Sequence, residues 1–261
     1  MAIDKISGKA FTDIDQISGI ATSAISKFSG VDAGAAPSIV TTDLVFHIDP
    51  ADSSSYPGSG STIYDLVGST NGTFEGGTYV DGNGHLRLDG VNDAIYFGII
   101  STSVPAALYN TSYSISAWCY NYDSGDSYQY FWSQRNSSSN DRFDFFRATN
   151  YDTLALRVDA SGTARQVGGV SFPKNSWQYV TANFNNTTNV LSLYRNASFG
   201  NSGTSQSPAN LSKRFRIGSN GYSNSSNEWN GKLGAFHVYD RQLSTTEITQ
   251  NYNATKATYG L

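Results

Sequence analysis

The chain has 261 residues, enough for one large domain, and its 17 basic and 21 acidic side chains give a net charge of −4. This balance argues against a nucleic-acid-binding protein, which needs a clustered basic surface to displace counterions. Aromatic residues reach 13% while helix-forming glutamate is scarce, so the composition predicts an all-β protein.

The first 31 residues contain a repeat with a period of 11 residues. Each unit has an isoleucine, two variable residues, an isoleucine or phenylalanine, and then Ser-Gly; the repeated apolar residues are Ile3, Ile6, Ile14, Ile17, Ile25 and Phe28. The three-residue step in each pair favours one side of a single helical turn that ends at the glycine. Two apolar side chains make no core, so we expect an arm that anchors the protein to a partner or a neighbouring copy, with a flexible leader as the alternative.

Residues 32–42 are small and polar with one proline, which is typical of a linker. From residue 43 onward, alternating apolar and polar residues with turns between them predict many short strands. The predicted strands lie in 43–49, 85–98 (two strands paired around the turn 89–93), 113–120, 128–134, 142–148, 153–159, 177–185, 190–196, 214–219 and 231–240. In 113–120, residues Tyr113, Ile115, Ala117 and Cys119 share one face.

One helix is predicted near the carboxyl terminus. Ser244 can cap its first turn, and Glu247, three residues later, completes a capping box. Leu243 and Ile248 are placed to form a hydrophobic staple, and the helix should end near Lys256. About a dozen strands and one short helix predict a two-sheet antiparallel sandwich.

Five stretches in this region carry a family resemblance. LRLDGVNDAIYF, YSISAWCY, SWQYVTANFNNTTNVLSLYRN, FRIGS and NGKLGAFHVYDRQLSTTEITQNYNA resemble the laminin-G-like, concanavalin-A-like lectin/glucanase family, in the variety common in bacterial and phage proteins. The resemblance covers roughly residues 43–257. It implies an antiparallel jelly roll over 43–261, preceded by the arm (1–31) and the linker (32–42). The arm and the ending KATYGL are similar to structural proteins of tailed phages.

The sequence predicts no catalytic site. Glucanase relatives of this fold use paired carboxylates in an E-x-D-x-E strand motif, and the three glutamates here are too far apart in sequence to form it. Asp141 and Asp144 are separated by an odd number of positions, which places their side chains on opposite faces of a strand. His47, His85 and His237 lie in or at the start of predicted strands, where structural histidines are common. We therefore predict that the protein is not an enzyme, with a hydrolase of unrecognised site as a less favoured alternative.

The resemblance also implies a possible structural calcium ion, because members of this superfamily often hold one. Asp89, Asn92 and Asp93 cluster in one turn and supply the hard oxygen atoms that Ca²⁺ prefers. The alternative is that these side chains cap the turn backbone.

Sugar binding would use aromatic side chains that stack on the apolar faces of sugar rings. The loop candidates are Tyr151, Tyr222 and Trp229, with loop packing as the alternative for Trp229. Tyr128, Tyr130 and Trp132 alternate along one strand and are predicted to share a face, with packing between the sheets as the alternative.

The amino terminus lacks the apolar core of a secretory signal, and the single cysteine, Cys119, forms no internal disulfide. A lectin-like domain without an export signal is expected to reach the cell exterior in a virus particle made in the host cytoplasm. We therefore predict a non-enzymatic virion protein of a tailed phage: a head decoration, neck, baseplate or tail component. Its arm would bind other virion proteins in an oligomer or lattice, and its sandwich would contact host-surface glycans, without nucleic-acid binding or membrane insertion. The alternative is a soluble bacterial carbohydrate-binding module.

Overall fold

The computed structural model divides the chain into two compact units, Met1–Ser38 and Ile39–Leu261. It describes six two-residue strands within residues 1–32, and residues 37–100, 108–122, 128–135, 142–148, 152–160, 162–208, 213–221 and 227–261.

Each repeat of the first unit contains one small antiparallel hairpin. The pairs are β1 (Lys5–Ile6) with β2 (Lys9–Ala10), β3 (Gln16–Ile17) with β4 (Ile20–Ala21), and β5 (Lys27–Phe28) with β6 (Val31–Asp32). The predicted helical turn is therefore wrong: Ile6, Ile17 and Phe28 lie in strands. Only Ser-Gly separates Ile6 from its partner Lys9, and a two-residue connection containing glycine suits a tight hairpin. Ile3, Ile14 and Ile25 lie outside the described residues, and anchoring by the arm stays a prediction.

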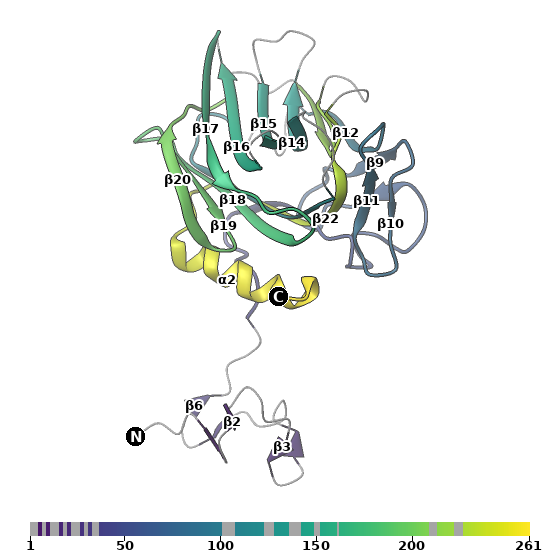
Figure 1. The fold of residues 1–261 in the computed structure, drawn as a ribbon, viewed down its shortest axis with the longest axis vertical. Helices are drawn as coiled ribbons and strands as arrows, with labels where there is room; N and C mark the ends of the chain where they lie inside the picture. Colours follow the sequence, from purple (N-terminus) through teal and green to yellow (C-terminus); the bar gives the residue numbers. More distant parts are fainter. Residues whose placement is uncertain are drawn as a thin grey trace. The chain divides into compact units, whose positions relative to one another are not determined.

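The second unit is a jelly-roll sandwich of two eight-stranded antiparallel sheets (Figure 1). Sheet I contains, in spatial order, β10 (Tyr79–Val80), β11 (Leu86–Asp89), β22 (Asn230–Tyr239), β13 (Tyr113–Asn121), β18 (Trp177–Asn185), β19 (Val190–Arg195) and β20 (Ser198–Thr204), with β7 (Leu44–Ile48) also paired to β22. Sheet II contains β17 (Thr163–Ser171), β16 (Thr153–Ala160), β15 (Arg142–Ala148), β14 (Tyr128–Arg135), β21 (Lys213–Ile217), β12 (Ala94–Ile100), β9 (Gly72–Glu75) and β8 (Thr62–Ile63). The predicted all-β sandwich is confirmed.

The main core lies between the sheets, and strand alternation decides which side chains enter it. In β13, Tyr113, Ile115, Ala117 and Cys119 belong to this core, as the alternation predicts. The intervening Trp118 points to the other face of sheet I and packs in a separate aromatic cluster. Within the described residues no helix is long and apolar enough to cross a membrane.

The predicted helix is confirmed as α2 (Thr245–Thr255), which lies on the outer side of sheet I (Figure 1). The capping box between Ser244 and Glu247 is present in both directions, and a 3₁₀ turn, η4 (Lys256–Tyr259), follows the helix. Leu243 and Ile248 are buried together with Val40. The Val40 amide also donates to the Asn251 side chain at 2.8 Å, so the second unit begins within the segment predicted to be a linker.

One predicted strand pairing is wrong. The two strands in 85–98 do not form a hairpin, because β11 pairs with β10 and β22 in sheet I while β12 pairs with β9 and β21 in sheet II. The turn at 89–93 carries the chain from one sheet to the other. Leu88 and Ile95 both enter the main core, but from opposite sheets. The alternation along each strand is the same as it would be in a hairpin, so the sequence pattern does not distinguish the two arrangements.

Candidate functional site

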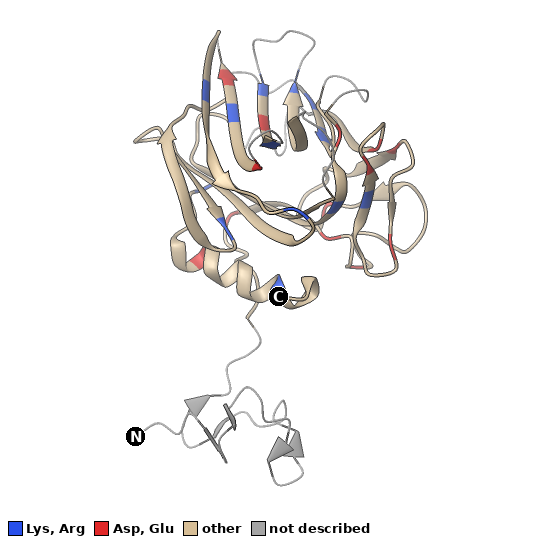
Figure 2. Cartoon of the chain, in the orientation of Figure 1, with Lys and Arg blue, Asp and Glu red and all other residues tan. Residues whose placement is uncertain are grey.

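Charged side chains gather on the face of sheet II that points away from the core. We call Arg135, Arg142, Asp144, Arg157 and Asp159 the charged face. They come from adjacent strands β14, β15 and β16, where Figure 2 shows blue and red segments side by side. Phenylalanines alternate with them in β15 and enter the core, so local alternation alone directs these charges outward.

The charged face is built from two guanidinium–carboxylate clusters. Asp144, whose side chain is only 1% exposed, accepts hydrogen bonds from Arg135 Nε and Nη2 at 3.0 and 2.6 Å, and from Ser133 Oγ at 2.6 Å. Asp159 accepts from Arg142 Nε at 2.5 Å and from Arg157 Nε and Nη2 at 2.8 and 3.1 Å. Bidentate, charge-assisted bonds of this kind fix the planes of the guanidinium groups.

The charged face carries an excess of positive charge. Burial lowers the pKa of the Arg135 guanidinium, but the Asp144 carboxylate overcomes this and raises it above the usual range. The face holds three arginines against two aspartates, and the exposed Arg214 lies opposite Arg135 in the register of β14 and β21. On a protein with a net charge of −4, this local excess would attract anionic ligands.

Two tyrosines of β14 lie on the same outer face, and one of them contacts an arginine. Tyr128 is 53% exposed and meets Phe146 edge-on, with ring centroids 5.3 Å apart, while the Arg135 guanidinium lies 4.7 Å from the centre of the Tyr130 ring. The prediction that Tyr128, Tyr130 and Trp132 share a face is wrong, because an irregularity in the pairing of β14 with β15 falls between Tyr130 and Trp132. Trp132 therefore enters the core, and the two tyrosines stay on the outer face.

The predicted sugar platform at Trp229 is also wrong. Its ring is fully buried in the main core, edge-on to Phe131 and Phe172 with centroids 5.6 and 6.0 Å away. Its indole nitrogen donates to the Lys232 carbonyl, so both its apolar and polar parts are used within the fold. The other two predicted platforms, Tyr151 and Tyr222, lie outside the described residues.

Two of the three predicted calcium ligands, Asp89 and Asp93, accept hydrogen bonds from backbone amides. Asp93 accepts from the amides of Gly77 and Asp89 through different carboxylate oxygens, and Asp89 Oδ1 accepts from Val91 and Asn92 at 2.8 and 3.4 Å. No three His, Cys, Asp or Glu side chains in the described ranges gather as a metal site. The hydrogen bonds fit capping of the turn, the alternative given for these side chains, and calcium binding stays an untested prediction.

Two of the histidines considered in the sequence form a pair, of which His237 is buried and His47 is half-buried. His47 on β7 and His237 on β22 face each other with ring centroids 4.6 Å apart. Burial lowers the pKa of both imidazoles. Within the described residues neither nitrogen of His237 has a hydrogen-bond partner.

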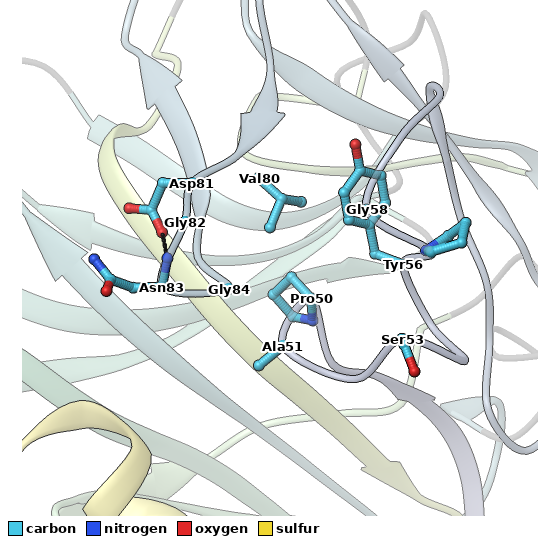
Figure 3. A pocket seen from close by; sticks show the side chains of 11 residues that line it. Pro50, Ala51, Ser53, Tyr56, Gly58, Val80, Asp81, Gly82, Asn83 and Gly84 are labelled. Atoms are coloured by element: carbon cyan, nitrogen blue, oxygen red, sulfur yellow. Dashed lines mark hydrogen bonds between the residues drawn. The ribbon is translucent and has the colours of Figure 1, made fainter.

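Two cavities adjoin the β10–β11 hairpin, and the sequence patterns indicate neither. The larger, of about 550 Å³, lies between segments 50–58 and 80–84 (Figure 3). The ring of Tyr56 and the side chains of Pro50 and Val80 line it, and the Asp81 carboxylate is bonded to the amides of Asn83 and His85. The smaller, of about 390 Å³, is lined by Gly77, Tyr79, Arg87, Leu88, Asp89, Asp93, Tyr122 and Asn230.

Residues 89–249 match the sequence model of the family described as the concanavalin A-like lectin/glucanases superfamily. No curated protein matches the chain. Solved structures with a similar fold include Trypanosoma rangeli sialidase in complex with sialic acid, at a TM-score of 0.62 and 14% identity, over 87% of this chain and 35% of that one. The chain thus spans about a third of that sialidase.

Two binding domains are also similar in fold. The CBM40 of Ruminococcus gnavus IT-sialidase, bound to α2,3-sialyllactose, has a TM-score of 0.52 and 12% identity over 63% of this chain and 94% of that one. The binding domain of botulinum neurotoxin DC, in complex with SialylT, has a TM-score of 0.61 and 14% identity over 81% of this chain and 51% of that one. At these identities the similarity shows a common fold.

Proposed function

The chain belongs to the concanavalin A-like lectin/glucanase superfamily, and on this premise we propose that it is a carbohydrate-binding protein whose glycan site is the charged face of sheet II. The observation that carries the proposal is the set of guanidinium groups fixed by Asp144 and Asp159. The Tyr130 ring lies 4.7 Å from the Arg135 guanidinium, and the exposed Tyr128 ring lies farther along β14, next to Phe146. Fixed donors can bind sugar hydroxyls in defined directions, and a tyrosine ring can stack on the apolar face of a sugar. Because the arginines and the tyrosines lie on paired strands, little conformational entropy is lost when a ligand binds.

The proposed ligand is a glycan that carries an acidic sugar. The excess of arginine on the charged face favours an anionic group, and a guanidinium can bind a carboxylate through two parallel hydrogen bonds. Two proteins of similar fold were solved with sialylated ligands, which supports the choice of sialic acid as the first sugar to test.

We propose a binding role without catalysis. A retaining glycosidase places an acid and a nucleophile about 5 Å apart, and the acid must keep its proton near neutral pH. On the charged face each aspartate accepts hydrogen bonds from arginine, so its oxygen atoms are engaged within the fold. This arrangement suits the positioning of donors better than proton transfer.

Binding to α2,3-sialyllactose, with lactose for comparison, tests the proposal by isothermal titration calorimetry. The Arg157 side chain is 33% exposed, so Arg157→Ala should weaken sialyllactose binding about tenfold, equivalent to about 1.4 kcal/mol. Arg165→Ala is the matched control, since it removes the same charge from an exposed position on the neighbouring strand β17. Equal affinities for all three proteins, or no binding by the unaltered chain, would contradict the proposed site.

We also propose that the protein is a virion component anchored by its arm, as the sequence repeats and the phage resemblance suggest. The three hairpins at 11-residue spacing support a repeated docking unit. In an infected culture, a chain lacking residues 1–31 should fold but be missing from purified particles. Incorporation equal to that of the full chain would rule out anchoring by the arm.

A further inference from the structure

We propose that the smaller cavity beside the β10–β11 hairpin is a second sugar-binding site, separate from the charged face, and that it binds a neutral pyranose. The charged face belongs to sheet II, whereas Tyr79 and Arg87 of this cavity belong to sheet I. The proposal goes beyond the function proposed above and does not depend on it. It rests on the shape of the cavity, its fixed tyrosines and the balance of its charges.

The cavity has walls on paired strands. Its volume is about 390 Å³. Tyr79 on β10 is opposite Arg87 on β11, and Asp89 on β11 is opposite Asn230 on β22. Cross-strand hydrogen bonds therefore fix the spacing of these four residues before any ligand arrives, which is the arrangement that a specific binding site requires.

Cations hold the neighbouring tyrosines in place. The Arg87 guanidinium lies 5.2 Å from the ring centre of Tyr122, and the Lys232 ammonium lies 4.8 Å from that of Tyr120 and 5.9 Å from that of Tyr122. The rings of Tyr120 and Tyr122 also meet edge-on at 5.3 Å. Tyr79 differs from them because it is 53% exposed, and it therefore offers its ring to a ligand at the cavity rim.

The charges of the lining favour a neutral ligand over an acidic one. Asp89 and Asp93 bring two carboxylates against the one guanidinium of Arg87, and Arg87 is itself 3.4 Å from Asp81. Both carboxylates repel an acidic sugar. Because both Asp93 oxygens and Asp89 Oδ1 accept backbone amides, Asp89 Oδ2 is the carboxylate atom placed to accept a hydrogen bond from a sugar hydroxyl, and the two side chains thus have separate uses. Together with the exposed Tyr79 ring, they fit an uncharged sugar with several hydroxyls.

The larger cavity of Figure 3 is less suited to a ligand. The Asp81 carboxylate at its wall already accepts hydrogen bonds from the amides of Asn83 and His85, at 3.0 and 3.1 Å. Much of the remaining lining is glycine, proline and alanine, which offers a ligand few polar side chains.

Saturation-transfer NMR with the methyl glycosides of glucose, galactose and mannose tests the second site. We expect at least one of these probes to receive saturation from the unaltered full chain, and Tyr79→Ala to weaken its binding about tenfold. Tyr64→Ala, which removes another exposed tyrosine outside this cavity, is the matched control and should bind as the unaltered chain does. Thermal melting should show that both variants are folded, since both side chains are exposed.

The same samples separate the two sites. Arg157→Ala should retain binding of the neutral glycoside, and Tyr79→Ala should retain binding of sialyllactose if the charged face is the acidic-sugar site. Binding of no neutral glycoside, or unchanged binding by Tyr79→Ala, overturns the second site. Loss of neutral-glycoside binding in Arg157→Ala would show a single site and would also overturn it. Failure of sialyllactose to bind contradicts only the function proposed for the charged face.

Discussion

The outer faces of the two sheets are built by the same alternation but carry opposite chemistry. On sheet I the outward Trp118 is fully buried beneath the carboxyl-terminal segment, stacked on Tyr259 at 4.3 Å and hydrogen-bonded to Thr255 at 2.8 Å. On sheet II the outward side chains of β14–β16 include three arginines paired with Asp144 and Asp159, and these arginines remain partly exposed. The covered face stabilises the fold, whereas the charged face offers fixed hydrogen-bond donors to a ligand.

The covered face should give the largest change in stability. Trp118→Ala removes the stacking with Tyr259 and leaves a cavity beneath α2, so we expect a loss of about 3–5 kcal/mol in the free energy of unfolding, measured in urea. Tyr128→Ala on the charged face is the control, because its ring is largely exposed and its loss should cost less than 1 kcal/mol. Similar losses in the two variants would remove the distinction between the faces.

Breaking an ion pair on the charged face should have the next largest effect. Asp144→Asn removes the negative charge that Arg135 binds and leaves a largely buried guanidinium without its counter-charge. Removing one partner of a buried pair costs about 3 kcal/mol. Urea unfolding measures this loss, which should persist in 1 M salt because a buried pair is poorly screened. A loss below 0.5 kcal/mol would mean that water already screens the pair.

Acid should lower the free energy of unfolding through the histidine pair of sheet I. Because burial lowers the pKa of His47 and His237 in the folded state, the unfolded chain binds more protons below pH 6.5. Their contribution to stability is complete above pH 6.5 and is lost as the pH falls, by up to about 1.4 kcal/mol per pH unit for each histidine. The nearby Asp49, Asp52 and Asp65 oppose this shift at His47.

The pH dependence is measured by urea unfolding between pH 8 and pH 5. His237→Gln should flatten the curve, because the side chain that replaces histidine does not titrate. A slope unchanged by this substitution would assign the acid sensitivity to other groups.

The smallest effect is expected at the start of α2. Ser244→Ala removes the side chain that accepts the Glu247 amide hydrogen bond, which should cost about 1 kcal/mol. Thermal melting, with Thr246→Ala as a control inside the first turn, measures this loss. If Ser244→Ala and Thr246→Ala melt together, the cap does not contribute to the cover over sheet I.

The parts of the fold that follow local rules were predictable from sequence. The cap at Ser244 and the two faces of β13 each depend on residues close together in the chain. The edge strands β17 and β20 were missed, because most of their side chains are exposed and their glycines weaken the strand pattern.

The candidate sites were less accessible to sequence reasoning. The position of Asp144 between two phenylalanines of β15 shows that its side chain points outward. Its hydrogen bonds to Arg135 on the neighbouring strand β14 depend on the strand register, which the sequence does not give. Trp229 looked like a loop aromatic, and only its place between the sheets shows that it is core. The pairing of Tyr79 with Arg87 depends on a two-residue strand that has no periodicity of its own.

The sequence by itself determined the all-β class, the helix and the 11-residue repeat, since each follows from the chemistry of neighbouring residues. Tertiary structure decided which strands share a sheet, as the separation of β11 from β12 shows. It also decided that helix α2 covers sheet I, and that guanidinium groups meet carboxylates on sheet II. The physical reason is that strand alternation fixes only the side to which a residue points, whereas the partner on that side comes from distant parts of the chain.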